Sequence, residues 1–222
     1  MKILVDSTGL PDIVLAAVPI LFMYAPVLLC RIRGVDPWQY PMHLPSFRDK
    51  EPWLTALKLN VVVIAVVFVP WLFAYNLWQT TIFPWLLAQI GIRAPHWGFR
   101  GTWPDDLWML IGYHLFFVAI PEEFFYRGYI QTRLREVFRP RWTILGARLG
   151  WEWPLTAVIF AIGHSIVHPE WWHFAIFFPA LVFGWMRQRT GGVLAGALFH
   201  AWANVQVTTL DTLYGVVSVH HP

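Results

Sequence analysis

Six stretches of the chain contain no aspartate, glutamate, lysine or arginine, and each of them is mostly apolar. A helix needs about 20 predominantly apolar residues to cross a bilayer, and it satisfies its backbone hydrogen bonds within one segment. We therefore expect an all-α, polytopic membrane helix bundle with about six transmembrane spans. The stretches are Ile13–Cys30, Leu59–Ile92, Leu107–Pro121, Trp153–Pro169, Trp171–Met186 and Thr190–Leu210.

The composition excludes the other broad classes of protein. Only 13% of the 222 residues are charged and 57% are hydrophobic, whereas about 25% of an average soluble domain is charged. A chain of this length cannot bury so much apolar surface and still cover itself with polar groups. The single cysteine, Cys30, excludes an internal disulfide and a cysteine-based zinc cluster.

The second apolar stretch, Leu59–Ile92, has 34 residues and is longer than one span requires. We expect a span from about Leu54 to Trp78, after which the chain lies along the membrane surface. The two longer connections, Gly34–Trp53 and Gln79–Asp106, contain proline and tryptophan, which is typical of interfacial segments. The prediction is therefore six spans together with interfacial helices.

The basic residues predict the orientation of these spans. With the N-terminus outside, 13 lysines and arginines fall on the inner side and 3 on the outer side, and the opposite topology would reverse this bias. The same residues account for the net charge of +3, so we expect the bilayer as a partner and no nucleic acid. The inner group is Arg31, Arg33, Arg48, Lys50, Lys58, Arg127, Arg133, Arg135, Arg139, Arg141, Arg148, Arg187 and Arg189.

Two adjacent glutamates stand at the inner end of the third predicted span. Ionisable groups inside a membrane cost several kcal/mol and are usually functional. Glu123 and Arg127 are four residues apart in the orientation that favours an ion pair. Glu122 then lies about 100° further round the helix, where it faces other helices.

The fourth and sixth spans contain the other polar groups. Phe160 and His164 are four residues apart and share one helix face, while Gly163 allows a neighbouring helix to approach closely. His200 and Asn204 have the same spacing in the sixth span. Each group alone also fits a packing role, but a glutamate, two histidines and an asparagine together can activate a water and stabilise an oxyanion.

These groups resemble the motifs of the CPBP family of CAAX proteases and bacteriocin-processing intramembrane proteases, also called Abi. The family motifs are EExxxR, FxxxH and HxxxN, in this order on successive membrane helices. The likeness covers about Asp106 to Leu210. We expect residues 106–222 to form the catalytic bundle and residues 1–105 the N-terminal spans and interfacial segment of one integrated domain. The motifs read Glu122-Glu123-Phe-Phe-Tyr-Arg127, Phe160-Ala-Ile-Gly-His164 and His200-Ala-Trp-Ala-Asn204.

The resemblance implies a role for each motif residue. Glu122 would be the general base that activates a water, and His164 would hold the same water. His200 and Asn204 would line the oxyanion site. On this topology Glu122 lies near the inner edge of the membrane and His164 nearer the midplane, so the inner cavity must reach His164. The supporting residues would be Glu123, Arg127 and Phe160.

The resemblance also implies the reaction. The expected activity is endopeptidase cleavage of a membrane-associated protein or peptide, near a membrane-embedded or terminal segment. CAAX-type, leader and C-terminal sorting-signal processing all belong to this class, and a bacterial inner membrane is the implied location. A metal-free, glutamic-type mechanism is favoured and no cofactor is required, although Glu122, His164 and His200 could bind zinc.

Two other hypotheses remain open. A non-enzymatic membrane scaffold or immunity protein would use the polar groups for assembly. A rhomboid-like serine protease would use Ser165, the only serine in a predicted span, together with His200, and would leave Glu122 unexplained. We expect His168, which precedes a proline, to be a loop residue.

Overall fold

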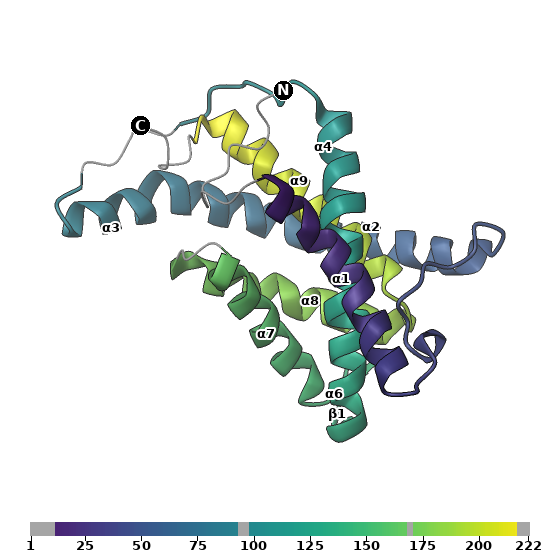
Figure 1. The fold of residues 1–222 in the computed structure, drawn as a ribbon. Coiled ribbons are helices and arrows are strands. Elements are labelled where there is room, and N and C mark those ends of the chain that lie inside the picture. The colour runs from purple at the N-terminus through teal and green to yellow at the C-terminus, as the bar shows by residue number, and fades with distance from the viewer. Residues whose placement is uncertain (1–11, 93–97, 168–170, 217–222) are drawn as a thin grey trace.

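The computed structural model describes residues 12–92, 98–167 and 171–216, and this part of the chain is helical almost throughout (Figure 1). The all-α class is therefore confirmed. The α-helices are α1 (Asp12–Ile32), α2 (Lys50–Leu77), α3 (Phe83–Gln89), α4 (Leu107–Tyr113), α5 (Ile120–Glu123), α6 (Gln131–Val137), α7 (Glu152–Val167), α8 (Phe177–Thr190) and α9 (Leu194–Tyr214). Two 3-10 helices are η1 (Pro37–Gln39) and η5 (Trp171–Ile176), and three π-helical segments are η2 (Trp78–Ile82), η3 (His114–Ala119) and η4 (Phe124–Ile130).

Two continuous helices of the described chain are long and apolar enough to cross a membrane, Lys50–Gln89 and Leu107–Val137. A shorter apolar helix runs from Ala17 to Ile32. Helices α7, α8 and α9 overlap the other three expected regions, and α8 and α9 each continue four residues beyond the expected end. The number of spans stays a prediction.

The second helix does not end where the sequence suggested. It continues past Trp78 to Gln89, and the segment η2 lies between α2 and α3. The Phe83 N–H donates to the Trp78 carbonyl oxygen, five residues back, which carries the helix across the following Pro84. A proline without an N–H is accommodated here by a π turn instead of a helix end.

The third helix also continues beyond its expected end at Pro121. It remains helical to Val137, with η3 and η4 on either side of α5. Glu122 therefore lies fifteen residues after Leu107 and fifteen before Val137, in the middle of this helix. The expected end at Pro121 was wrong, because the sequence showed only where the uncharged stretch stops, and the depth of Glu122 in the membrane stays a prediction.

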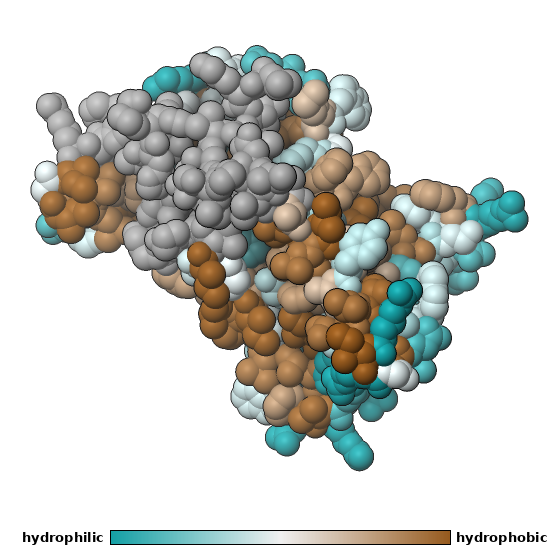
Figure 2. Space-filling view, viewed as in Figure 1, coloured by the Kyte–Doolittle hydropathy of each residue, from teal (hydrophilic) through white to brown (hydrophobic). Residues whose placement is uncertain are grey.

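The helices that carry the polar motifs pack directly on one another. Helix α9 packs against η3, α2 and α8, and α7 packs against α8. The N-terminal part belongs to the same bundle, because α1 packs against α5 and η4 (Figure 1). Hydrophobic side chains cover much of the face shown in Figure 2, and hydrophilic ones gather towards its right-hand and lower ends.

Several helix ends that were predicted to lie on the inner side, where most lysines and arginines fall, meet around one cavity of about 690 Å³. The segment after α1, the first turns of α2, the end of α8 and the start of α9 all line it, with Tyr40, Thr55, Arg187 and Gly192 among the lining residues. These ends therefore lie on one side of the bundle.

A small hairpin between α6 and α7 was not predicted. Strand β1 (Trp142–Ile144) pairs antiparallel with β2 (Ala147–Leu149). Strands of three residues are too short to show an alternating pattern in the sequence. Leu145 and Gly146 form the turn with φ values of 46° and 79°.

Candidate active site

Glu122 projects from α5 towards α7 and α9. Its Oε2 atom lies 3.7 Å from Nε2 of His164 and 3.8 Å from Nε2 of His200. This oxygen is buried and makes no hydrogen bond in the described part of the chain. The fold thus brings three of the four predicted catalytic residues together, from three different helices.

The other imidazole nitrogens show how each ring is held. Nδ1 of His164 lies 3.0 Å from the carbonyl oxygen of Phe160, and Nδ1 of His200 lies 3.2 Å from Oε1 of Glu123. A carbonyl and a carboxylate only accept hydrogen bonds, so both Nδ1 atoms carry the hydrogen. In the neutral ring Nε2 is then an acceptor.

When both rings are neutral, three hydrogen-bond acceptors converge here: one carboxylate oxygen and two Nε2 atoms. Groups of this kind do not bond to one another and instead attract a donor between them. A water molecule, which carries two hydrogens, has the chemistry to satisfy two of them. The arrangement is suited to holding a water and removing a proton from it.

Glu123 and Arg127 form the ion pair that their spacing predicted. Nη1 of Arg127 lies 2.9 Å from Oε1 of Glu123, and both side chains are completely buried. Arg127 also donates to the carbonyl oxygen of Ala180 at 3.2 Å, so it connects this helix to α8. Since Glu123 accepts from His200 as well, the pair fixes both the glutamate and the histidine.

Phe160 lies at the centre of an aromatic cluster. The Arg127 guanidinium lies over its ring at 4.2 Å, and the His164 ring is 4.4 Å away. Phe183 on α8 stacks on His200 with a centroid distance of 4.6 Å and an interplanar angle of 14°. The sequence did not predict Phe183, because one phenylalanine in an apolar helix carries no distinguishing signal.

Two glycines allow the helices to approach this closely. A Cβ atom on Gly163 would lie 2.5 Å from the Tyr126 hydroxyl, and one on Gly196 would lie 2.9 Å from Oε2 of Glu123. The close approach expected at Gly163 is present, and its partner is η4.

Other predicted residues lie apart from this cluster. Asn204 follows His200 by one turn on α9 and is partly exposed. Its side chain makes no hydrogen bond to any described residue. The Ser165 hydroxyl donates to the carbonyl of Ala161 in its own helix at 3.0 Å. His168 lies outside the described residues.

Asn60 is a contributor that the sequence analysis missed. It is buried on α2, and its amide donates to the carbonyls of Ala56 and Ala195 at 2.9 and 3.1 Å. This contact ties α2 to α9 at Ala195, five residues before His200 of the third motif. An asparagine near the start of the apolar stretch 59–92 was the available signal.

A metal site was also tested against the geometry. The donors of Glu122, His164 and His200 suit zinc chemically. Across residues 12–92, 98–167 and 171–216, however, no three His, Cys, Asp or Glu side chains are arranged to hold a metal ion.

Fold and site together define a membrane helix bundle with a buried carboxylate–histidine cluster. Residues 103–206 match the model of the family described as Rce1-like type II CAAX prenyl endopeptidases. This match confirms the CPBP resemblance over that segment, and together with the long apolar helices it indicates an integral membrane protein. Searches of the curated proteins and of the solved structures give no significant match.

Proposed function

We propose that the chain is an intramembrane endopeptidase that hydrolyses a peptide bond near a membrane-embedded or terminal segment of a protein substrate, using a water activated by Glu122 and His164. One observation carries this proposal: the buried, unbonded Oε2 of Glu122 faces two imidazole Nε2 atoms at 3.7 and 3.8 Å. These residues lie within the segment that matches a CAAX endopeptidase family.

In the first step, Glu122 takes a proton from the water while Nε2 of His164 accepts the water's second hydrogen bond. The water oxygen bonds to the carbonyl carbon of the substrate, and the carbonyl π electrons move onto its oxygen. When this tetrahedral species collapses, the C–N bond breaks and the protonated Glu122 gives its proton to the leaving nitrogen. Water is consumed, and no covalent enzyme intermediate forms.

The developing oxyanion needs hydrogen-bond donors. His200 can donate from Nε2 only when its ring is doubly protonated, and its Nδ1–H donates to the Glu123 carboxylate at 3.2 Å. We assign Asn204, one turn along α9, as the second donor. Glu123 and Arg127 act as positioning residues that hold His200.

The mechanism uses no metal or other cofactor. For the cellular setting we propose a bacterial inner membrane with the N-terminus outside, because 13 of 16 basic residues then lie inside. The substrate would be a CAAX-type protein, a leader-bearing precursor or a protein with a C-terminal sorting signal.

A matched pair of variants tests the mechanism. The purified protein in detergent is given a farnesylated CAAX-type peptide, and mass spectrometry follows release of the C-terminal fragment. Glu122→Gln keeps the shape of the side chain but removes the base, so we expect turnover to fall by about 10²–10⁴-fold. Ser165→Ala should retain turnover.

The other outcomes are equally informative. An active Glu122→Gln with an inactive Ser165→Ala would support the serine-protease hypothesis. Full activity of both variants would contradict the glutamate mechanism, and no cleavage by the unaltered chain on this or on leader and sorting-signal peptides would favour the scaffold hypothesis. Loss of turnover in a chelator, restored by zinc, would contradict the metal-free reaction.

A further inference from the structure

The hairpin between α6 and α7 has an inner face that packs on the bundle. Ala147 and Leu149 of β2 are completely buried. The Trp185 indole on α8 donates to the carbonyl oxygen of Ile144 at 2.9 Å. The hairpin therefore has a defined position against α8, and its tip and outer face are left to meet something else.

The tip is apolar, exposed and conformationally unfavourable. Leu145 is 80% exposed, and its φ of 46° lies in the left-handed region, where asparagine or glycine is normally found. Trp142 and Trp151 make an edge-to-face pair at 5.4 Å beside it, and both rings are more than a third exposed. A leucine at this turn position gains nothing from the core, because it does not reach it.

The hairpin and its flanks also carry unneutralised positive charge. Arg139, Arg141 and Arg148 are exposed, and no carboxylate of the described residues pairs with them. By contrast, Arg135 at the end of α6 is paired with Glu152 at 3.0 Å. The hairpin therefore presents a basic outer surface next to an apolar tip.

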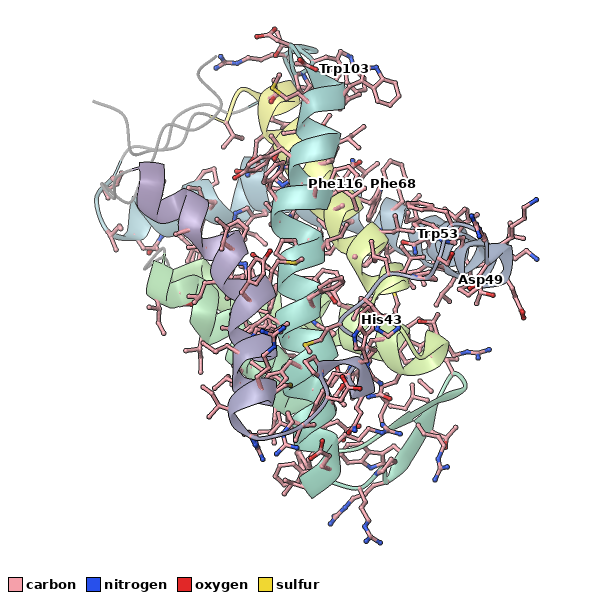
Figure 3. All side chains as sticks on the ribbon, turned by 45° about the vertical axis from the view of Figure 1, so that its right-hand side comes forward. His43, Asp49, Trp53, Phe68, Trp103 and Phe116 are labelled. Atoms are coloured by element: carbon pink, nitrogen blue, oxygen red, sulfur yellow. The ribbon has the colours of Figure 1, made fainter. Side chains whose placement is uncertain are left out.

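Its position along the bundle places this surface at the level of lipid headgroups. The helix Leu107–Val137 has 31 residues and is about 45 Å long, compared with about 30 Å for the hydrocarbon core of a bilayer. The helix ends two residues before Arg139. In Figure 3, nitrogen-tipped side chains at this lower end of the bundle point away from it.

We propose that the segment 139–151 is a docking site for anionic phospholipid. Leu145 and the exposed edges of Trp142 and Trp151 enter the interface, and the three arginines bind the phosphate groups. Charge complementarity and continuity with a membrane-crossing helix select this occupant. The proposal does not depend on the proteolytic mechanism.

The chain's single cysteine makes a direct test possible. Cys30→Ala combined with Leu145→Cys carries one NBD fluorophore at the tip, and the full-length protein is reconstituted into vesicles. One set contains phosphatidylcholine alone, and the other contains equal parts of phosphatidylcholine and phosphatidylglycerol. Spin-labelled lipids with a shallow nitroxide report contact with the interface, and aqueous iodide reports exposure to water.

We expect the shallow nitroxide to quench the Leu145→Cys probe, and more strongly when phosphatidylglycerol is present. Asp105→Cys, an exposed position two residues before α4, is the matched control and should not respond to lipid charge. Replacing Arg139, Arg141 and Arg148 by Gln should remove this response, with the apparent affinity for phosphatidylglycerol falling about fivefold per arginine.

A probe quenched equally in both bilayers would overturn the role of the arginines. A probe that iodide reaches and the nitroxide does not would overturn the docking site itself and leave the hairpin for an aqueous partner. Because Leu145 makes no core contact, the Leu145→Cys variant should elute as the unaltered chain does. Leu145→Asn and Leu145→Ile carry no probe at this position, so their apparent affinity for phosphatidylglycerol is compared instead. An affinity that is lost with Leu145→Asn but retained with Leu145→Ile would support the role of the apolar tip.

Discussion

Helix α2 and the segment η4 are both embedded in the bundle, but they differ sharply in what they bury. Only Ala56 and Asn60 are buried among the 28 residues of α2. Five of the seven residues of η4 are buried, and these include Arg127. The more apolar helix is thus the more exposed one, and Val61, Val66 and Val69 of α2 are each 68% exposed.

This contrast follows from the solvent. Apolar side chains gain little by leaving lipid for protein, so membrane helices are held by close packing and polar contacts. The side chains that stabilise this bundle should therefore be the buried polar ones, which are also the ones around Glu122. Three substitutions test this contrast. Unfolding of each variant is followed through Cys30, because this buried thiol reacts with a fluorogenic maleimide only when the protein unfolds.

The largest effect should follow from Arg127→Met. It leaves the Glu123 carboxylate completely buried without its guanidinium, and breaking a buried pair in this way costs about 3–5 kcal/mol. We expect a large fall in the unfolding temperature measured by Cys30 labelling in detergent, and loss of turnover because His200 is no longer held.

The double variant Glu123→Gln with Arg127→Met is the control. It removes both charges, so part of the lost stability should return. If the single variant unfolds at the temperature of the unaltered chain, the ion pair does not stabilise the bundle and the contrast between η4 and α2 loses its main support.

The sequence predicted contacts within one helix better than contacts between helices. The helical repeat alone predicts the Glu123–Arg127 pair. It also predicts that Glu122 points away from that pair towards other helices, and both features are present. The π segments η3 and η4, and the stacking of Phe183 on His200, depend on how several helices pack. No single-helix pattern contains that information.

The same limit explains why the third helix was expected to end at Pro121. An uncharged stretch ends at Glu122, and a charge normally marks the end of a span. Here the next residues, including Arg127, are buried in protein, so the charge is neutralised inside the bundle. In the sequence, the charges of a buried ion pair therefore look the same as the charges that mark the end of a span.

An intermediate effect is expected for Gly163→Ala. The added Cβ would lie 2.5 Å from the Tyr126 hydroxyl, which belongs to a buried side chain. Overpacking of this kind costs about 1–3 kcal/mol, and it would also displace the neighbouring His164. We expect a lower unfolding temperature and lower turnover.

Tyr126→Phe provides the matched second change, because it removes the atom that the new methyl meets. Stability and turnover should recover in the double variant, while Tyr126→Phe alone should have little effect. Additive losses in the double variant would show that the close approach of η4 to α7 is not what requires glycine.

The smallest effect should come from α2, where one buried polar side chain, Asn60, connects the helix to α9. Asn60→Leu removes the hydrogen bond to Ala195 on α9, and such bonds between membrane helices contribute about 0.6 kcal/mol on average. Val62→Ala, on the exposed face of the same helix, is the control and should leave the unfolding temperature unchanged. An equal loss in both variants would mean that α2 is held by its apolar surface, and the distinction between the two regions would fail. A measurable loss confined to Asn60→Leu would show that the buried amide of this mostly exposed helix contributes to its attachment to α9.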